Sequence, residues 1–320
     1  MKIQSKDLTE DLKAGRPNVK DSTIKQYENN LLKLKKIFNS DSYDFLSNPK
    51  TVMEKLEDKH YLSQRNFLNS IVVLLLALDS DNEYEKLIGE YSTIRDNFNE
   101  KYTNENKNNN VISDKQSKNF GTIQEVYDML NKMADDLKPT RKKTELTKKE
   151  MQLLQAYTLF SIYSRMPFRN DVADGTEAIT KAALNKKSKQ EQREKNWLLI
   201  EKNKLSWIMN IYKSDKTYGQ KVIVVEDKTL KRILNHYIKI NGHGVLFKTS
   251  SGKPLTRTEL SKTLLKFSKK YSGKAWSSTI LRKIYLSSKY GDMKKELEAD
   301  NAIMGHSKTM ALDTYVKEEQ

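Results

Sequence analysis

The chain contains no cysteine and only four histidines, which excludes several kinds of chemistry. Without cysteine there are no disulfides, no thiol nucleophile and no zinc site built from thiolates. No two of the histidines have the spacing of metal ligands; they are His60, His236, His243 and His306. We therefore expect neither a bound metal nor another cofactor.

Glycine and long apolar runs are also scarce. The eleven glycines are scattered and form no phosphate-binding loop, so the sequence gives no support for ATP dependence. The longest apolar run, Ile71 to Leu78, is far shorter than the roughly 18 residues that a membrane span requires. The chain becomes charged directly after Met1, without an apolar secretory segment. We expect a protein that is neither secreted nor bound to a membrane.

Positive charge, in contrast, is abundant. The 320 residues include 58 lysines and arginines against 42 acidic residues, a formal net charge of +16. Such a balance favours a polyanionic partner, and its length makes two domains the natural expectation. The polar, unpatterned stretch 101–119 predicts a linker, so we place the domains at residues 1–110 and 111–320.

The first domain is predicted to be helical. Apolar residues recur at helical spacing after Asp21, Ser22 and Thr23, which offer capping side chains. Two further amphipathic stretches follow, at residues 62–76 and 84–98. Lysines on the polar face of the first helix are either solvated or in contact with the partner.

The second domain combines helices with a few strands. Capping boxes at Thr122–Glu125 and Thr256–Glu259 predict two helix starts, and another helix begins near Lys148 and stops near Pro167. Residues 196–225 predict three short antiparallel strands. Further helices are expected at 278–290 and around Tyr315. The fold class is thus mainly α with a small antiparallel β-sheet (α+β).

Five residues in the second domain have the chemistry needed to break a DNA strand without a metal; they are Arg169, Lys213, Arg282, His306 and Tyr315. A nucleophile must attack phosphorus, cations must stabilise the non-bridging oxygens, and an acid must protonate the leaving oxygen. Arginine provides a permanently charged fork, lysine a transferable proton, and tyrosine a covalent phosphoester.

This ordered set resembles the tyrosine recombinase (integrase) family. The segment Pro167 to Asp171 is similar to a Pro-Leu-Arg-Asn-Asp variant of integrases from large DNA viruses and their satellites. The resemblance implies a helical DNA-clamping domain followed by a catalytic domain, which cleave and rejoin strands through a 3′-phosphotyrosine intermediate. It also implies a homotetramer on two double-stranded DNA duplexes, working in the host nucleus, the cytoplasm or a viral factory.

The resemblance assigns the first arginine to Arg169, supported by Asp171 or Asp174 nearby. Arg165, four residues earlier on the same helical side, is the competing choice. The lysine of the family lies on a hairpin and reaches the leaving oxygen. Lys213 fits this position, and Lys216, within the turn, is the alternative.

The remaining positions lie towards the end of the chain. Arg282 matches the second arginine, but Thr279 stands where the family usually has histidine. A hydroxyl donates a hydrogen bond to phosphate but does not accept a proton near neutral pH. His306 or water would then assist Tyr315, the nucleophile, while Gly305 permits close backbone approach.

Two other functions are compatible with these residues. A type IB DNA topoisomerase uses the same chemistry as a monomer and reseals the strand that it cut. A DNA-binding protein with a decayed active site would retain the positive charge without the activity, as the threonine at position 279 suggests.

Overall fold

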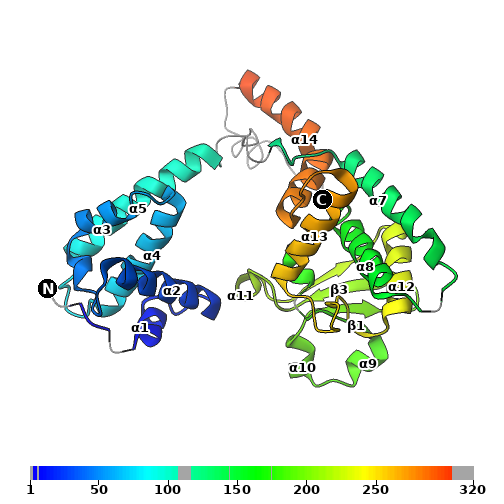
Figure 1. Ribbon diagram of the computed structural model, residues 1–320, viewed down its shortest axis with the longest axis horizontal. Helices are drawn as coiled ribbons and strands as arrows, with labels where there is room; N and C mark the ends of the chain where they lie inside the picture. Colours follow the sequence, from blue (N-terminus) through cyan, green and yellow to red (C-terminus); the bar gives the residue numbers. More distant parts are fainter. Residues whose placement is uncertain (1–2, 6, 107–116, 144, 174, 305–320) are drawn as a thin grey trace. The chain divides into compact units, whose positions relative to one another are not determined.

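A computed structural model describes residues 3–5, 7–106, 117–143, 145–173 and 175–304. The chain divides into two compact units, residues 1–112 and 113–320, each of which is described by itself (Figure 1). The sequence predicted this division at residue 110, within the same polar stretch.

The N-terminal unit is helical throughout its described residues. Its elements are α1 (Leu8–Gly15), α2 (Asp21–Phe38), the 3₁₀ turn η1 (Asp44–Ser47), α3 (Pro49–Leu56), α4 (Tyr61–Leu78) and α5 (Glu85–Asn106). The predicted helical character of this part of the chain is confirmed.

Helix α4 forms the centre of the N-terminal unit. Most side chains from Phe67 to Leu75 are buried, and α1, α2 and α5 all pack against this helix. Among the described helices, α4 is the one long and apolar enough to cross a membrane, but half of its 18 residues are buried inside the unit. This is typical of the core helix of a soluble protein.

Helix α2 begins without the predicted side-chain cap. The helix starts at Asp21 itself, and the preceding Lys20 makes no capping hydrogen bond with its side chain. Asp21 therefore lies in the first turn, where its negative charge is favourable beside the positive end of the helix dipole. The helix ends at Asn39, whose left-handed backbone (φ 46°) asparagine tolerates well.

The C-terminal unit is built from helices around a small sheet. Its helical elements are α7 (Ile123–Leu137), η2 (Lys138–Thr140), α8 (Lys148–Tyr163), η3 (Asn170–Val172), α9 (Lys181–Asn185), α10 (Lys189–Arg193), α11 (Asp215–Tyr218), α12 (Lys228–Asn241), α13 (Arg257–Ser272) and α14 (Ser278–Met304). Its strands are β1 (Glu177–Thr180), β2 (Trp197–Ile200), β3 (Leu205–Met209), β4 (Lys221–Val224) and β5 (Gly244–Val245). The chain is mainly helical, as expected, with 64% helix.

The sheet has the order β4-β3-β2-β1-β5 and is mixed rather than antiparallel. The three predicted antiparallel strands are present as β2, β3 and β4, with β3 ending at Met209 rather than at Tyr212. The prediction missed β1, which pairs parallel with β2, and β5, which pairs antiparallel with β1. β1 begins with glutamate and alanine, which are poor strand formers, and β5 has only two residues.

A basic stretch connects the two parallel strands. Helices α9 and α10 lie within this crossover, and Lys187 and Lys195 have their ammonium groups 5.6 and 6.0 Å from the ring centroid of Trp197. Trp197 is only 1% exposed and packs with Ile179 and Leu184. At least these two lysines therefore cover an aromatic side chain with their aliphatic stems.

Helix α8 organises the core of this unit. It contacts α7, α12, α13 and α14, and these helices lie around it in Figure 1. Tyr163 at its end, Trp207 on β3 and Trp276 before α14 are all fully buried. Both predicted capping boxes, at Thr122 and Thr256, are formed. Helix α14 continues to Met304, beyond the predicted end at residue 290.

We expect the capping box of α8 to stabilise this unit measurably. The Thr147 hydroxyl accepts a hydrogen bond from the backbone amide of Glu150, and Glu150 binds the Thr147 amide in return. Thr147→Ala should lower the free energy of unfolding by about 1 kcal/mol, because a helix donor loses its partner. Tryptophan fluorescence during urea unfolding would measure this, since all three tryptophans lie in this unit.

The matched control is Thr263→Ala in the interior of α13. The Thr263 hydroxyl bonds the Glu259 carbonyl one turn back, so its loss should change stability little. Equal effects of the two substitutions would show that the cap contributes nothing specific.

Candidate functional site

Arg169 follows α8 and directly precedes η3. The buried hydroxyl of Tyr163 lies 3.2 Å from the carbonyl oxygen of Arg169 and 3.3 Å from Oδ1 of Asn170, and it contacts both. The side-chain amide of Asn170 in turn donates from Nδ2 to Ser261 Oγ at 2.9 Å, and this bond connects the loop to α13. The backbone of Arg169 is thus fixed from two helices, while its side chain is exposed.

Arg165, the competing first arginine, is occupied by the protein itself. Its Nε lies 3.3 Å from Asp227 Oδ1, in an ion pair. The remaining contacts are to Ser161 O, Ser164 Oγ and the ring of Tyr127. Because its side chain is only 16% exposed, Arg165 holds α7, α8 and the start of α12 together rather than facing a ligand.

Arg282 lies in the first turns of α14. Its Nε donates to Ser278 O at 3.4 Å, and its Nη2 donates to Thr279 Oγ1 at 3.2 Å. Thr279, which replaces the expected histidine, therefore accepts a hydrogen bond from the arginine beside it. Its hydroxyl helps to orient the guanidinium.

Arg169 and Arg282 lie within electrostatic reach of each other. Partial burial is the main cause that lowers the pKa of Arg282, and the positive charge of Arg169 is the second. Tyr163 and Asp171 act in the opposite direction and raise this pKa. Side chains from the end of α8 and from η3 thus act electrostatically on Arg282 of α14, although they are far apart in sequence.

Asp171 is the one buried charged side chain among the residues that the structure describes. It was expected to support Arg169, but its ion pair is with Arg257 at the start of α13, where Nη2 and Oδ1 are 3.1 Å apart. The carboxylate thus faces α13, and the expected support of Arg169 by Asp171 stays a prediction. The alternative, Asp174, lies outside the described residues.

Tyr163 is a tyrosine close to both arginines, but it does not have the properties of a nucleophile. It is completely buried, and its hydroxyl contacts the loop at Arg169 and Asn170. Burial raises its pKa above the ordinary tyrosine value, and the charge of Arg282 offsets only part of this effect. A phenol in this environment stays protonated and serves to hold the loop.

Lys213 and Lys216 both lie in the connection between β3 and β4. Lys213 is in the turn before α11 and Lys216 is within α11, and both side chains are exposed. Tyr212 anchors the connection: its hydroxyl donates to Gly219 O at 2.7 Å and its amide to Asp215 Oδ2 at 3.2 Å. The choice between the two lysines therefore stays open.

Gly305, His306 and Tyr315 lie outside the described residues. Helix α14 carries Arg282 and reaches Met304, the residue directly before Gly305.

Two residues at this site escaped the sequence reasoning. Arg257 was visible only as a position inside the second capping box, where nothing marks it as the partner of Asp171. Asn196 gave no signal beyond standing at the beginning of a strand, yet its buried carboxamide bonds the loop of Asp171 and the chain before Lys213. Both contacts join segments that are distant in sequence.

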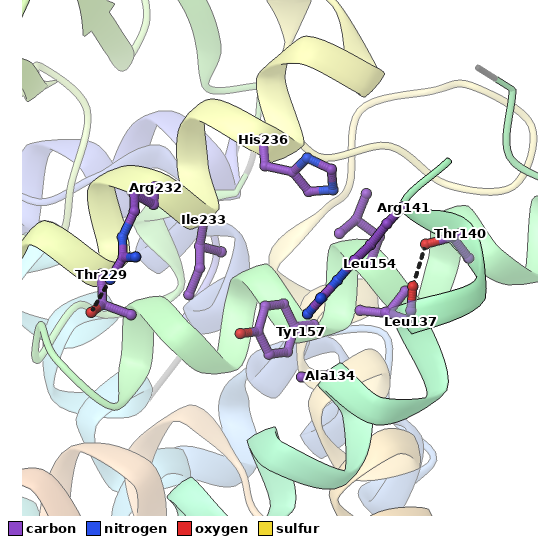
Figure 2. A pocket seen from close by; sticks show the side chains of 10 residues that line it. All are labelled: Ala134, Leu137, Thr140, Arg141, Leu154, Tyr157, Thr229, Arg232, Ile233 and His236. Atoms are coloured by element: carbon purple, nitrogen blue, oxygen red, sulfur yellow. Dashed lines mark hydrogen bonds between the residues drawn. The ribbon is translucent and has the colours of Figure 1, made fainter. Parts of the chain in front are cut away.

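A pocket of about 310 Å³ lies elsewhere in the same unit, between the end of α7, α8 and α12 (Figure 2). Leucine, isoleucine and tyrosine side chains form much of its wall, with Arg141, Arg232 and His236 also lining it. Of the predicted site residues that the structure describes, Arg169, Lys213 and Arg282, none lines this pocket, so it is separate from the Arg169–Arg282 site.

No group of three histidine, aspartate or glutamate side chains within the described parts of the chain is arranged to hold a metal ion. No protein-family model matches the sequence, and no curated protein and no solved structure matches it either.

The Asp171–Arg257 pair predicts an asymmetric response to substitution. Arg257→Ala should lower the free energy of unfolding by about 3 kcal/mol, because it removes the ion-pair partner of a buried carboxylate. Asp171→Asn should cost only about 1 kcal/mol, since Arg257 is half-exposed and water can solvate it. Urea unfolding followed by tryptophan fluorescence measures both values.

The double substitution should be closer to Asp171→Asn than to the sum of the two single losses. Lys181→Ala, which breaks the exposed pair with Glu201, is the control and should change stability by less than about 0.5 kcal/mol. Equal losses for Arg257→Ala and Lys181→Ala would contradict the buried pair.

Proposed function

We propose that the chain is a site-specific DNA recombinase that cleaves and rejoins strands through a 3′-phosphotyrosine intermediate, without metal or ATP. The observation that carries the proposal is the proximity of Arg169 and Arg282. Two guanidinium groups that repel each other in the free protein are suited to a ligand that carries negative charge, and a DNA phosphate provides it.

The two arginines are accessible enough to act on such a phosphate. Arg169 is exposed and Arg282 is partly exposed. Each guanidinium can donate to a non-bridging oxygen, and these bonds strengthen as negative charge develops on the oxygens in the transition state. Arg282 is oriented by Thr279 and Ser278, so little reorganisation accompanies binding.

In the proposed reaction, the Tyr315 oxygen attacks phosphorus and the bond from phosphorus to the 5′ oxygen breaks. The leaving 5′ oxygen takes a proton from Lys213, or from Lys216 if that lysine reaches it. A 5′-hydroxyl from a second DNA end then attacks the phosphotyrosine and gives its proton back to the lysine. The phosphodiester is restored, the bond from phosphorus to the Tyr315 oxygen breaks, and the group that took the Tyr315 proton returns it.

The proton of Tyr315 needs an acceptor other than Thr279. The Thr279 hydroxyl is bound to Arg282, and an alcohol does not accept a proton near neutral pH. We assign this role to His306 or to water. Threonine in this position thus supports the arginine rather than the nucleophile.

Strand exchange requires four protomers on two duplexes, as the resemblance to recombinases implies. A type IB topoisomerase is the alternative outcome for the same chemistry. Resolution of a Holliday junction supports the recombinase, whereas relaxation of supercoiled DNA by a monomer, without exchange, supports the topoisomerase.

The nucleophile is tested with a nicked DNA substrate that traps the covalent intermediate. The wild-type protein should give an adduct on a denaturing gel, and Tyr315→Phe should give none, because phenylalanine has no oxygen to attack phosphorus. Tyr290→Phe is the matched control, since Tyr290 is 45% exposed on α14, and it should retain the adduct. Absence of an adduct with wild-type protein on every cognate DNA indicates a DNA-binding protein without activity.

The arginines are tested by rate and by salt dependence. Arg169→Ala and Arg282→Ala should each slow adduct formation by about 10² to 10³, the usual loss for one donor to a developing oxyanion. Each should also reduce the slope of log affinity against log salt by about 1, since one phosphate contact is lost. Arg232→Ala on α12, whose guanidinium donates to the Thr229 hydroxyl, is the control and should change neither value.

A further inference from the structure

We propose that Asn196 is a positioning residue that sets the lysine-bearing connection in register with the loop of Arg169. This inference rests on the proposed function, because it concerns the geometry of the same site. It adds a residue that the sequence gave no reason to select.

The side chain of Asn196 uses all of its hydrogen-bonding capacity inside the protein. Its Nδ2 donates to Asp171 O at 3.0 Å and to Ile211 O at 2.8 Å. Its Oδ1 accepts from the backbone amides of Asn210 and Ile211, both at 2.8 Å. A carboxamide offers two donor hydrogens and two acceptor lone pairs, so all four are satisfied in a residue that is only 5% exposed.

These four bonds join the two segments that carry the proposed catalytic groups. Asp171 stands two residues after Arg169, and Ile211 stands two residues before Lys213. Two residues of chain span at most about 7 Å. Arg169 and Lys213 are therefore each separated by a short length of backbone from a residue that the Asn196 carboxamide bonds. One carboxamide therefore defines the distance between the two backbones.

The position of Asn196 at the end of the β2–β3 ladder explains why a side chain, rather than the backbone of β2, bonds these groups. Trp197 pairs with Ile208 at the edge of the β2–β3 ladder, and β3 ends at Met209. Beyond this point the backbone turns away towards α11, and its amides can no longer pair with β2. The Asn196 carboxamide takes the place of a strand backbone for the amides of residues 210 and 211.

A second asparagine holds the other side of the same connection. Asn210 Nδ2 donates to Gln192 O at 2.8 Å and to Lys195 O at 2.6 Å, and its Oδ1 accepts from Gln220 Nε2 at 2.7 Å. The beginning of the connection is thus fixed to the crossover between β1 and β2, and Gln220 at its far end is fixed to Asn210. The chain from Ile211 onwards starts from a rigid base.

The test exploits a difference between oxygen and sulfur as leaving atoms. A DNA with sulfur in place of the 5′ bridging oxygen releases a thiolate, whose conjugate acid has a pKa of about 8.5. An alkoxide, comparable to hydroxide with a conjugate acid near about 15.7, needs a proton from the enzyme. A variant whose defect lies in the position of the general acid is therefore slow on oxygen and restored on sulfur.

We expect Asn196→Ala and Asn196→Asp to slow adduct formation on the oxygen substrate by about 10², the usual effect of a displacement near 1 Å. On the sulfur substrate the loss should be less than about tenfold, as for Lys213→Ala or Lys216→Ala, whichever lysine is the acid. Asn241→Ala is the matched control, because Asn241 also bonds backbone carbonyls, at Val245 and Leu246. It should show no difference between the two substrates.

If Asn196→Ala is slowed equally on both substrates, or on neither, the role of Asn196 is refuted. The activity of the wild-type protein would in that case still support the recombinase. Hydrogen exchange provides a second readout that needs no activity. In Asn196→Ala the amides of Asn210 and Ile211 should exchange at least tenfold faster, with the β2–β3 ladder unchanged. If the wild type forms no adduct, the proposed function fails, and unchanged exchange at these two amides then separately refutes the role of Asn196.

Discussion

The site depends on holding two positive charges together at a partly buried place. The charge of Arg169 and the partial burial of Arg282 both lower the pKa of Arg282, so the arrangement is unfavourable by itself. Asp171 acts in the opposite direction, and Arg257 neutralises the same carboxylate from α13. A single buried carboxylate thus links the two arginine-bearing segments with a third helix. Without it, the repulsion between the guanidinium groups would be opposed by Tyr163, by the hydrogen bonds of Arg282 to Ser278 and Thr279, and by packing.

The helices around α8 convert this electrostatic arrangement into a fixed geometry. α8 ends in the buried Tyr163, whose hydroxyl contacts the loop of Arg169, and α13 binds the same loop through Ser261. α14 packs against α8 through its first turns, which include Arg282. Because each segment is fixed by contacts with the same core, the arginines converge without a direct bond between them. A phosphate placed between them would replace repulsion by two favourable charge contacts.

The sheet contributes the third part of the site. The connection between β3 and β4 carries Lys213 and Lys216, and the Asn196 carboxamide bonds its first residues and the carbonyl of Asp171 together. Helix core and sheet are therefore connected at the point where the proposed reaction would use a general acid and a cation. The pocket in Figure 2, with its more apolar wall, lies in the same unit but shares none of these residues.

The sequence by itself determined what depends on neighbouring residues. Apolar spacing located the longer helices of both units but not the short helices α1, α3, α9, α10 and α11. The pairs Thr122–Glu125 and Thr256–Glu259 located two helix starts, and three of the five strands were evident. The order of basic and aromatic residues also suggested the chemistry. The local pattern did not identify the exact first residue of a helix. At Asp21, for example, several neighbouring residues could equally begin the helix.

Tertiary structure decided which charged and polar groups meet. The sequence left Arg165 as the competing choice to Arg169, but in the structure Asp227 and Tyr127 occupy Arg165, whereas Arg169 is exposed. The partner of Asp171 and the four bonds of Asn196 likewise come from segments distant along the chain. Such contacts follow from how helices and strands pack around a shared core. The energy of an ion pair or a buried amide depends on the groups that surround it in the folded protein rather than on its neighbours in sequence.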